Sequence, residues 1–185
     1  MKTIGQVVDR NIVRVAKKFS KDEVIEYLDI SSIDNASKAI TGTTPYILAD
    51  APSRAQYILQ KNDILYSTVR PNLQNIAINP YSAENIIGST GFCVLRCKEV
   101  TTGFMWGLIT SDLFTERMVS LASGANYPAV TDKIVYAYEF PMPPIEQQRC
   151  FERVVERSDK SKFELEQAIA RIDNLIKSLI QQDEN

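Results

Sequence analysis

The chain has 185 residues, 44% of them hydrophobic and 24% charged, which suits one soluble globular domain with an appended element and leaves no apolar run of the ~18–20 residues that span a membrane. The net charge is −2, and residues 1–144 hold 14 basic and 14 acidic side chains, so composition gives no basic excess of the kind usual in DNA-binding domains. The sequence has no histidine, which removes the commonest general base and metal ligand, and we therefore expect neither a catalytic residue nor a metal site.

The first part of the chain is predicted to be rich in strands. Residues 25–33 (IEYLDISSI) alternate between apolar and polar side chains and are bounded by polar residues. The segments 63–69, 75–80 and 91–98 read as further strands, and the run 60–63 (QKND) is typical of a turn before the first of them.

The second part is predicted to begin with helix and to return to extended structure. Residues 102–122 carry large apolar side chains close to the 3.6-residue helical period, which predicts one helix, or two that are separated at Ser111 and Asp112. Residues 132–141 (DKIVYAYEFP) alternate and predict a last strand. The prolines at 141–144 then mark a boundary, because proline lacks a donor and forces extended backbone on what precedes it. We expect one domain over 1–143 and a separate element over 144–185.

Residues 145–182 contain neither glycine nor proline and favour helix throughout. At 1.5 Å per residue they predict a rod of roughly 57 Å. Apolar side chains recur along it at heptad spacing. The predicted interface positions are Phe151, Val154, Leu165, Ala168, Ile172, Leu175 and Leu179.

An apolar stripe of this kind can also be the face that a helix packs on its own domain, and that alternative stays open. A small domain extends only ~30 Å, however, so much of the rod would find no cover there. We therefore favour a coiled coil with a second helix, in which Ser158 and Ser161 interrupt the seam and could fix its register.

The cysteines are Cys93, Cys97 and Cys150. The first two are four residues apart on a predicted strand, roughly 13 Å, which is too far for a disulfide. We interpret both as buried small residues. An odd, sparse set of cysteines fits a reducing compartment, and residues 1–20 lack the apolar core of a signal peptide, so we expect a cytoplasmic protein.

Two segments resemble the specificity subunits of type I restriction-modification systems. One is 124–154, with a Gly-polar loop, an extended run, a proline-rich exit and a Gln-rich helix start, and the other is 61–78 (KNDILYSTVRPNLQNIAI). The order of parts also resembles one repeat of that family, from IGQVVD at 4–9 to the long helix. The resemblance covers nearly the whole chain, which has one recognition domain and one helix where a complete member has two of each.

This resemblance implies an α+β fold, in which a mixed α/β target recognition domain with a twisted sheet presents loops to the major groove and is followed by a long coiled-coil helix. It implies double-stranded DNA as the ligand. The implied partners are a modification (methyltransferase) subunit, which brings S-adenosylmethionine, and a restriction (endonuclease) subunit. The chain itself would hold no cofactor. It would pair with itself as a homodimer or with another half-subunit, and two copies about a twofold axis would read an interrupted palindrome.

Base edges are read by side chains with paired donors and acceptors, above all Arg, Asn and Gln. The run 67–75 concentrates such residues after a predicted strand. The DNA-binding candidates in it are Ser67, Thr68, Arg70, Asn72 and Gln74, with the last three as first choices for contacts to bases or phosphates.

The loop 123–128 is the second choice, because Gly124 permits unusual backbone angles while Asn126 and Tyr127 could reach a groove. Lys133 and Arg54 are candidates for phosphate contacts only. The alternative for each residue is a solvated surface or a structural ion pair. A coiled-coil adaptor without DNA binding stays open as an alternative function, since it would explain both the helix and the neutral charge.

Overall fold

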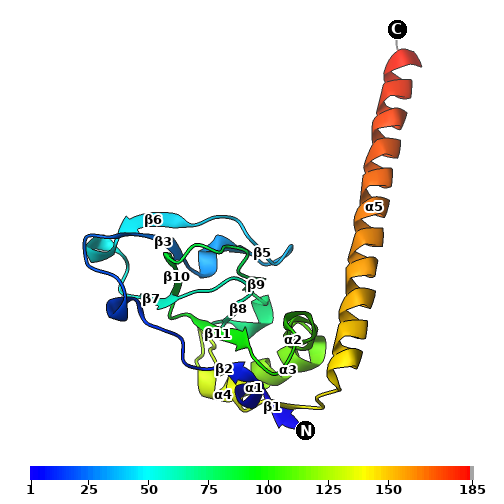
Figure 1. Ribbon diagram of the computed structural model, residues 1–185. Coiled ribbons are helices and arrows are strands. Elements are labelled where there is room, and N and C mark those ends of the chain that lie inside the picture. Colours follow the sequence, from blue (N-terminus) through cyan, green and yellow to red (C-terminus); the bar gives the residue numbers. More distant parts are fainter. Residues whose placement is uncertain (184–185) are drawn as a thin grey trace. The chain divides into compact units, whose positions relative to one another are not determined.

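The computed structural model describes the backbone of residues 1–183 and the side chains of residues 1–158 and 160–174. It contains two compact units, Met1–Pro143 and Pro144–Asn185, which are described separately. The helices are α1 (Ile4–Val7), α2 (Thr102–Ile109), α3 (Asp112–Leu121), α4 (Asp132–Tyr136) and α5 (Ile145–Asp183), and the 3₁₀ turns are η1 (Val15–Lys17), η2 (Ile30–Ser32), η3 (Leu48–Asp50) and η4 (Pro71–Leu73) (Figure 1). The strands are β1 (Lys2–Thr3), β2 (Val8–Asp9), β3 (Val24–Leu28), β4 (Ile33–Asp34), β5 (Ala39–Ile40), β6 (Thr44–Ile47), β7 (Ala55–Ile58), β8 (Ile64–Ser67), β9 (Ile76–Ile78), β10 (Ile86–Ser89), β11 (Phe92–Cys97) and β12 (Glu139–Phe140).

Two four-stranded sheets form the frame of the first unit, in the orders β6-β3-β10-β7 and β2-β11-β8-β9. In the first sheet β3 and β10 are parallel, whereas the other neighbours in both sheets are antiparallel. The short pairs β1-β12 and β4-β5 complete the pairing among the described residues. A mixed α+β unit with twisted sheets and a long helix after it was the expected fold class, and the structure confirms it.

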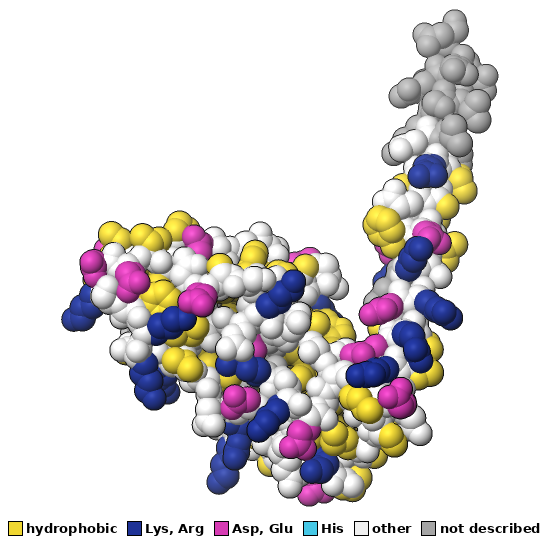
Figure 2. All heavy atoms as spheres, viewed as in Figure 1, with side chains coloured by type: hydrophobic (Ala, Val, Ile, Leu, Met, Phe, Trp, Pro, Cys, Tyr) yellow, Lys and Arg dark blue, Asp and Glu magenta, His cyan; other side chains and the backbone are white. Residues whose placement is uncertain are grey.

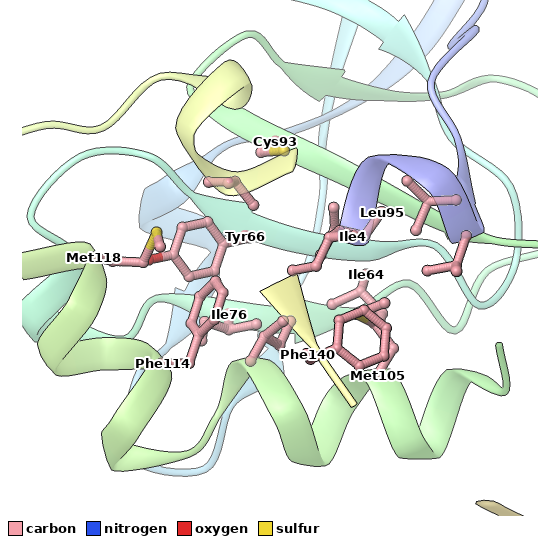
Figure 3. Close-up of a cluster of buried hydrophobic side chains, with 14 of the residues drawn as sticks. Ile4, Ile64, Tyr66, Ile76, Cys93, Leu95, Met105, Phe114, Met118 and Phe140 are labelled. Carbon is pink, nitrogen blue, oxygen red and sulfur yellow. The ribbon is translucent and has the colours of Figure 1, made fainter. Parts of the chain in front are cut away.

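Strand β11 divides the core into two layers because its side chains alternate between the faces of the sheet. Cys93 and Leu95 join the cluster that α1 to α4 cover, while Phe92 and Val94 join a cluster on the other side. Figure 3 shows the first cluster, in which the rings of Tyr66 and Phe114 lie edge to face with centroids 5.6 Å apart. Each large apolar side chain buried in this way contributes about 1.5–3 kcal/mol to stability.

A buried ion pair ties the predicted turn at 60–63 to the core. The Arg96 guanidinium donates from Nε to Asp63 Oδ1 at 2.8 Å and from Nη2 to Oδ2 at 2.7 Å, and Asp63 is 1% exposed. Asp63 Oδ2 also accepts from the Gln60 amide, and Asn62 takes a left-handed φ of 69°. The predicted turn is thus present, and it leads directly into β8.

The predicted strands at 63–69, 75–80 and 91–98 are present as β8, β9 and β11. The strand predicted over 25–33 is confirmed only in its first half. Chain direction changes after Leu28 because the Asp29 side chain accepts a hydrogen bond from the Ser31 amide at 2.9 Å and starts η2.

The strand predicted over 132–141 is wrong for most of its length. Residues 132–136 form α4, and only Glu139 and Phe140 are extended. Thr131 caps the helix, because its side chain accepts from the Ile134 amide at 3.4 Å and the acidic Asp132 occupies the first turn. The alternation of apolar residues was therefore misleading as evidence for a strand. Val135 is fully buried because it lies on the inward face of a short helix.

Residues 102–122 form two helices, the second of the two alternatives. Ser111 separates them as the N-cap of α3, where its hydroxyl accepts from the Phe114 amide at 3.3 Å and donates to Leu108 O at 2.7 Å. One hydroxyl thus satisfies groups at the end of one helix and the start of the next.

The second unit is the helix α5, whose backbone is continuous from Ile145 to Asp183 as predicted. Along the part of the chain that the structure describes, no helix is both long and apolar enough to cross a membrane. Of the cysteines, Cys93 is buried, Cys97 is half-buried and Cys150 is exposed, and none of these described residues forms a disulfide. The expectation of burial therefore holds fully only for Cys93.

Candidate nucleic-acid interface

The first predicted recognition loop is a turn with a fixed and unusual backbone. Arg70 and Gln74 both adopt left-handed conformations, with φ of 51° and 48°, on either side of η4. Pro71 opens η4 and is buried. Left-handed conformations are uncommon for residues other than glycine, so the surrounding contacts must hold this turn in place.

The two predicted recognition loops lie side by side, although the residues that join them, such as Arg70 and Pro128, are far apart in the chain. The Val130 amide donates to Thr68 O at 2.9 Å, and the Arg70 amide donates to Pro128 O at 2.7 Å. Ala129 forms isolated bridges with both Val69 and Ser123. These backbone bonds join 68–70 to 123–130 as a short ribbon.

Gly124 allows the second loop to close. Its φ is +106°, and a Cβ at this position would lie 2.9 Å from Tyr127 O. Any other residue at this position would have a strained backbone and a Cβ that clashes with Tyr127 O. The sequence-based argument for glycine at this point is therefore supported by its geometry.

Arg70 and Tyr127, predicted separately as first- and second-choice candidates, form one exposed unit. The Arg70 guanidinium lies over the Tyr127 ring with its carbon 4.5 Å from the ring centroid, and its Nη2 donates to Asn126 O at 3.4 Å. Tyr127 is 68% exposed. Stacking on the ring orients the planar guanidinium and leaves N–H groups at its edge for a further acceptor.

The charge of these loops differs from that of the whole chain. Neither 67–75 nor 123–130 contains an aspartate or a glutamate, whereas Arg70 is present. Figure 2 shows Lys and Arg side chains distributed over the visible face with Asp and Glu among them, so no uniform basic block forms there. Any attraction of an anion by this region is therefore local.

The remaining candidates of the first loop fall into two groups. Asn72 is exposed in η4. The Gln74 side chain is occupied within the protein, because its Oε1 accepts from Lys38 Nζ at 2.9 Å and its Nε2 donates to Thr115 Oγ1 at 2.7 Å. Partial burial lowers the pKa of Lys38. Gln74 thus holds the turn between the β4-β5 hairpin and α3.

Ser67 and Thr68 are buried, at 2% and 9% exposure. Ser67 Oγ donates to Val69 O at 3.0 Å, and Thr68 Oγ1 donates to Gly91 O at 3.1 Å. Both hydroxyls therefore position the start of the recognition loop rather than facing solvent.

The two phosphate candidates are exposed but lie at different places. Arg54 O accepts from the Thr90 amide, and the next residue, Gly91, accepts from the Thr68 amide, so Arg54 adjoins the first loop through the β10-β11 turn. Lys133 lies on α4, where it lines a hollow together with Arg10. Sequence reasoning missed Arg10, as well as the anchors Lys38 and Thr115, because each acts through residues far away in the chain.

The predicted interface of α5 carries large apolar side chains that are open to solvent in the single chain. Phe151, Val154, Leu165 and Ile172 are 39%, 61%, 65% and 55% exposed. Ala168 is exposed as well. The side chains of Leu175 and Leu179 lie outside the described residues. Within residues 1–158 and 160–174, no group of three or more Cys, Asp or Glu side chains is placed to hold a metal ion.

Comparison with known families decides the assignment. The sequence model described as "Type I restriction modification DNA specificity domain" matches residues 1–173. The chain belongs to this family. It is 25% identical over 138 residues to the EcoDI specificity subunit of Escherichia coli, which covers 72% of this chain and 30% of that protein. To the HindI specificity subunit of Haemophilus influenzae it is 28% identical over 116 residues, or 60% of this chain and 25% of that protein.

Solved structures agree with this membership. The HsdS subunit from Thermoanaerobacter tengcongensis is 32% identical with a TM-score of 0.83, covering 97% of this chain and 46% of that one. A chain from a type I R-M system, solved to explain complex assembly and conformational transition, is 33% identical with a TM-score of 0.74, covering 86% and 43%. The chain therefore spans less than half the length of these relatives.

Proposed function

We propose that this chain is the DNA-sequence-reading, non-catalytic subunit of a type I restriction-modification complex, and that it directs the methyltransferase and endonuclease subunits to a bipartite target. In this proposal, Arg70, Asn72, Asn126 and Tyr127 form the reading surface. Arg54 adds a phosphate contact beside it.

The observation that carries the proposal is the convergence of two distant loops on one exposed edge. The Arg70 amide bonds to Pro128 O, and its guanidinium stacks on Tyr127. Arginine held in this way can donate two parallel hydrogen bonds to guanine O6 and N7, and an exposed asparagine amide can pair with adenine. The left-handed turn and the engaged Gln74 side chain reduce the freedom that such contacts would otherwise cost.

The helix supplies the second half of the proposal. A bipartite reader needs two recognition surfaces at a fixed separation, and a rigid helical rod provides it. We infer that α5 pairs antiparallel with α5 of a second copy, which would put one recognition domain at each end. The target would then be an interrupted palindrome. Another half-subunit in place of the second copy would give two different half-sites.

The test begins with the methylome of the host with and without the gene, since the motif that disappears names the target. Duplexes with that motif and with a scrambled motif are then compared for binding to the wild type and to Arg70→Ala. We expect the substitution to weaken specific binding by about 1–3 kcal/mol and to relax the preference at one position of each half-site. Lys61→Ala, an exposed cation in the 60–63 turn, is the matched control.

Three outcomes are informative. Equal loss on both duplexes would make Arg70 a phosphate contact, and no loss would remove Arg70 from the reading surface and leave Asn126 and Tyr127 as the next candidates. If the wild type binds neither duplex at 50 mM or 200 mM salt, the reader proposal fails and the coiled-coil adaptor takes its place, because phosphate contacts strengthen steeply as salt falls.

A further inference from the structure

A basic groove lies outside the predicted recognition loops. It consists of two adjoining hollows that share Arg10, Asp132 and Tyr136. The wider hollow is also lined by Lys133, and the narrower one by Arg14 and Tyr57. The narrower hollow has a volume of about 190 Å³. That is room for roughly six waters at ~30 Å³ each, and so for a phosphate group.

Backbone pairing fixes the walls of this groove. Arg14 forms an isolated antiparallel bridge with Tyr57, and the Ile58 amide donates to Val13 O at 2.9 Å. The stretch that carries Arg10 and Arg14 is thereby held against β7. Their side chains extend from a firm support, although both are exposed.

The two guanidinium groups lie within cation–π distance of tyrosine rings. Arg10 Cζ lies 6.0 Å from the Tyr136 ring centroid, and Arg14 Cζ lies 5.8 Å from the Tyr57 centroid. Among the described residues neither forms an ion pair with a carboxylate, whereas Arg96 pairs with Asp63 at 2.7 Å. Like Arg70, each guanidinium thus lies by a tyrosine ring, although farther from the centroid than the 4.5 Å of Arg70 from that of Tyr127.

Asp132 is the carboxylate that lines both hollows, and it would oppose a bound anion. It is about half-buried and hydrogen-bonded to the buried Cys93 thiol, and burial raises its pKa. Three cations, Arg10, Arg14 and Lys133, line the two hollows against this one carboxylate. Lys133, exposed on the same helix, adds a positive charge at the wider hollow.

The groove is close enough to the recognition loops for one duplex to reach both. Tyr127 and Asp132 are five residues apart, so at most ~18 Å of chain separates them. Half a turn of B-DNA measures roughly 17 Å. One duplex is therefore long enough to contact the Arg70 loop and the groove together.

We propose that the Arg10–Arg14 groove, with Lys133 at its wider end, binds the phosphodiester backbone of the DNA whose bases face the Arg70–Tyr127 loops. This rests on the proposed DNA-reading function. Its role is to set register and orientation on the duplex, without sequence preference of its own.

The test measures binding of a mixed-sequence 40-base-pair duplex to the whole chain as a function of salt. Arg10→Ala/Arg14→Ala is expected to lower the slope of log affinity against log salt by about 1.8, since each lost phosphate contact removes ~0.9. That is about 60-fold at 0.1 M salt if the affinity extrapolated to 1 M is unchanged. The double variant Lys61→Ala/Lys98→Ala removes the same charge at exposed positions outside the groove and should keep the wild-type slope.

A second measurement needs no variant. Arginine modification by phenylglyoxal, followed by mass spectrometry, should slow at Arg10 and Arg14 when the duplex is added, while the exposed Arg117 on α3 reacts at the same rate. Unchanged reaction at Arg10 and Arg14, or an unchanged slope in the double variant, overturns the groove proposal alone. If the wild type shows no salt-dependent binding, the proposed DNA-reading function itself is wrong.

Discussion

Replacing Leu165 and Ile172 with aspartate tests whether α5 is a dimer seam. Fully burying a leucine or isoleucine contributes about 1.5–3 kcal/mol, and these side chains are still 65% and 55% exposed in the single chain. Covering the exposed fractions of four such side chains in a dimer is therefore worth about 4–7 kcal/mol. Losing that contribution weakens the dimer by roughly 10³–10⁵-fold, because each 1.4 kcal/mol is a factor of ten. The new carboxylates add a desolvation cost on top.

Phe163→Asp is the matched control for this experiment. Phe163 is 61% exposed, nearly as much as Leu165, and stands two residues before it on the same helix. Two residues correspond to about 200° around the helix axis, so Phe163 lies away from the heptad seam. Its substitution adds one carboxylate per chain, as each of the two seam substitutions does, and removes a similar apolar area, yet it should leave the dimer intact.

Sedimentation at micromolar concentration provides the assay. We expect the wild type and Phe163→Asp to be dimers and Leu165→Asp/Ile172→Asp to be a monomer with unchanged far-ultraviolet signal from its globular unit. A monomeric wild type, without DNA or other subunits, would refute self-pairing and point to a different half-subunit. Equal dissociation of both variants would refute the heptad seam.

The direction of pairing can be measured on the native cysteines. Cys150 is exposed near the start of α5, whereas Cys93 is buried. In an antiparallel dimer centred between Leu165 and Ile172, the two Cys150 residues would be roughly 50 Å apart. A short bis-maleimide should then fail to join the chains. Efficient cross-linking through Cys150 would show parallel pairing. The inference that the target is an interrupted palindrome depends on antiparallel pairing and would then fail.

Four further outcomes are expected. Asp63→Ala should lower the free energy of unfolding in urea by about 3–5 kcal/mol, because it leaves the Arg96 charge unpaired, and Asp63→Leu/Arg96→Met should recover much of that loss. Gln74→Ala should cost about 1–3 kcal/mol of stability through two lost hydrogen bonds, and should reduce DNA affinity without changing the preferred motif. Gly124→Ala should cost about 1–3 kcal/mol through its positive φ and should weaken DNA binding in parallel, whereas unchanged binding would separate this loop from the reading surface. Purified chain with labelled S-adenosylmethionine and DNA should transfer no methyl group, and detectable transfer would overturn the non-catalytic assignment.

Local pattern was sufficient for those parts of the fold that are short apolar runs bounded by polar or turn residues. Strands β8, β9 and β11 are runs of this kind, and the side chains of β8 are buried on both faces of the sheet. Pattern was insufficient for α4, where the alternation extends over only a few residues. A single threonine cap decides such a segment, and caps are easily overlooked in a run of β-branched and aromatic residues.

The candidate interface was predictable by residue type but not by position. Arg70 and Tyr127 were both selected from the sequence, yet nothing in it indicates that one stacks on the other across 57 positions. Gln74 illustrates the opposite case. A glutamine amide can pair with adenine, but the amide of Gln74 is hydrogen-bonded to Lys38 and Thr115. Whether a polar side chain is available for DNA therefore depends on neighbours that only the fold brings together.

The same contacts divide the first loop into anchors and free side chains. Ser67, Thr68 and Gln74 bond inward, so replacing one of them loosens the turn that supports the reading side chains. Asn72 and Arg70 project from that path. A change of target sequence should therefore be reachable by substitution at the projecting positions while the anchors stay constant, because base readout then varies on an unaltered support. Swapping an anchor together with a projecting residue would instead lose binding to every sequence, since the support and the reading side chain would move at once.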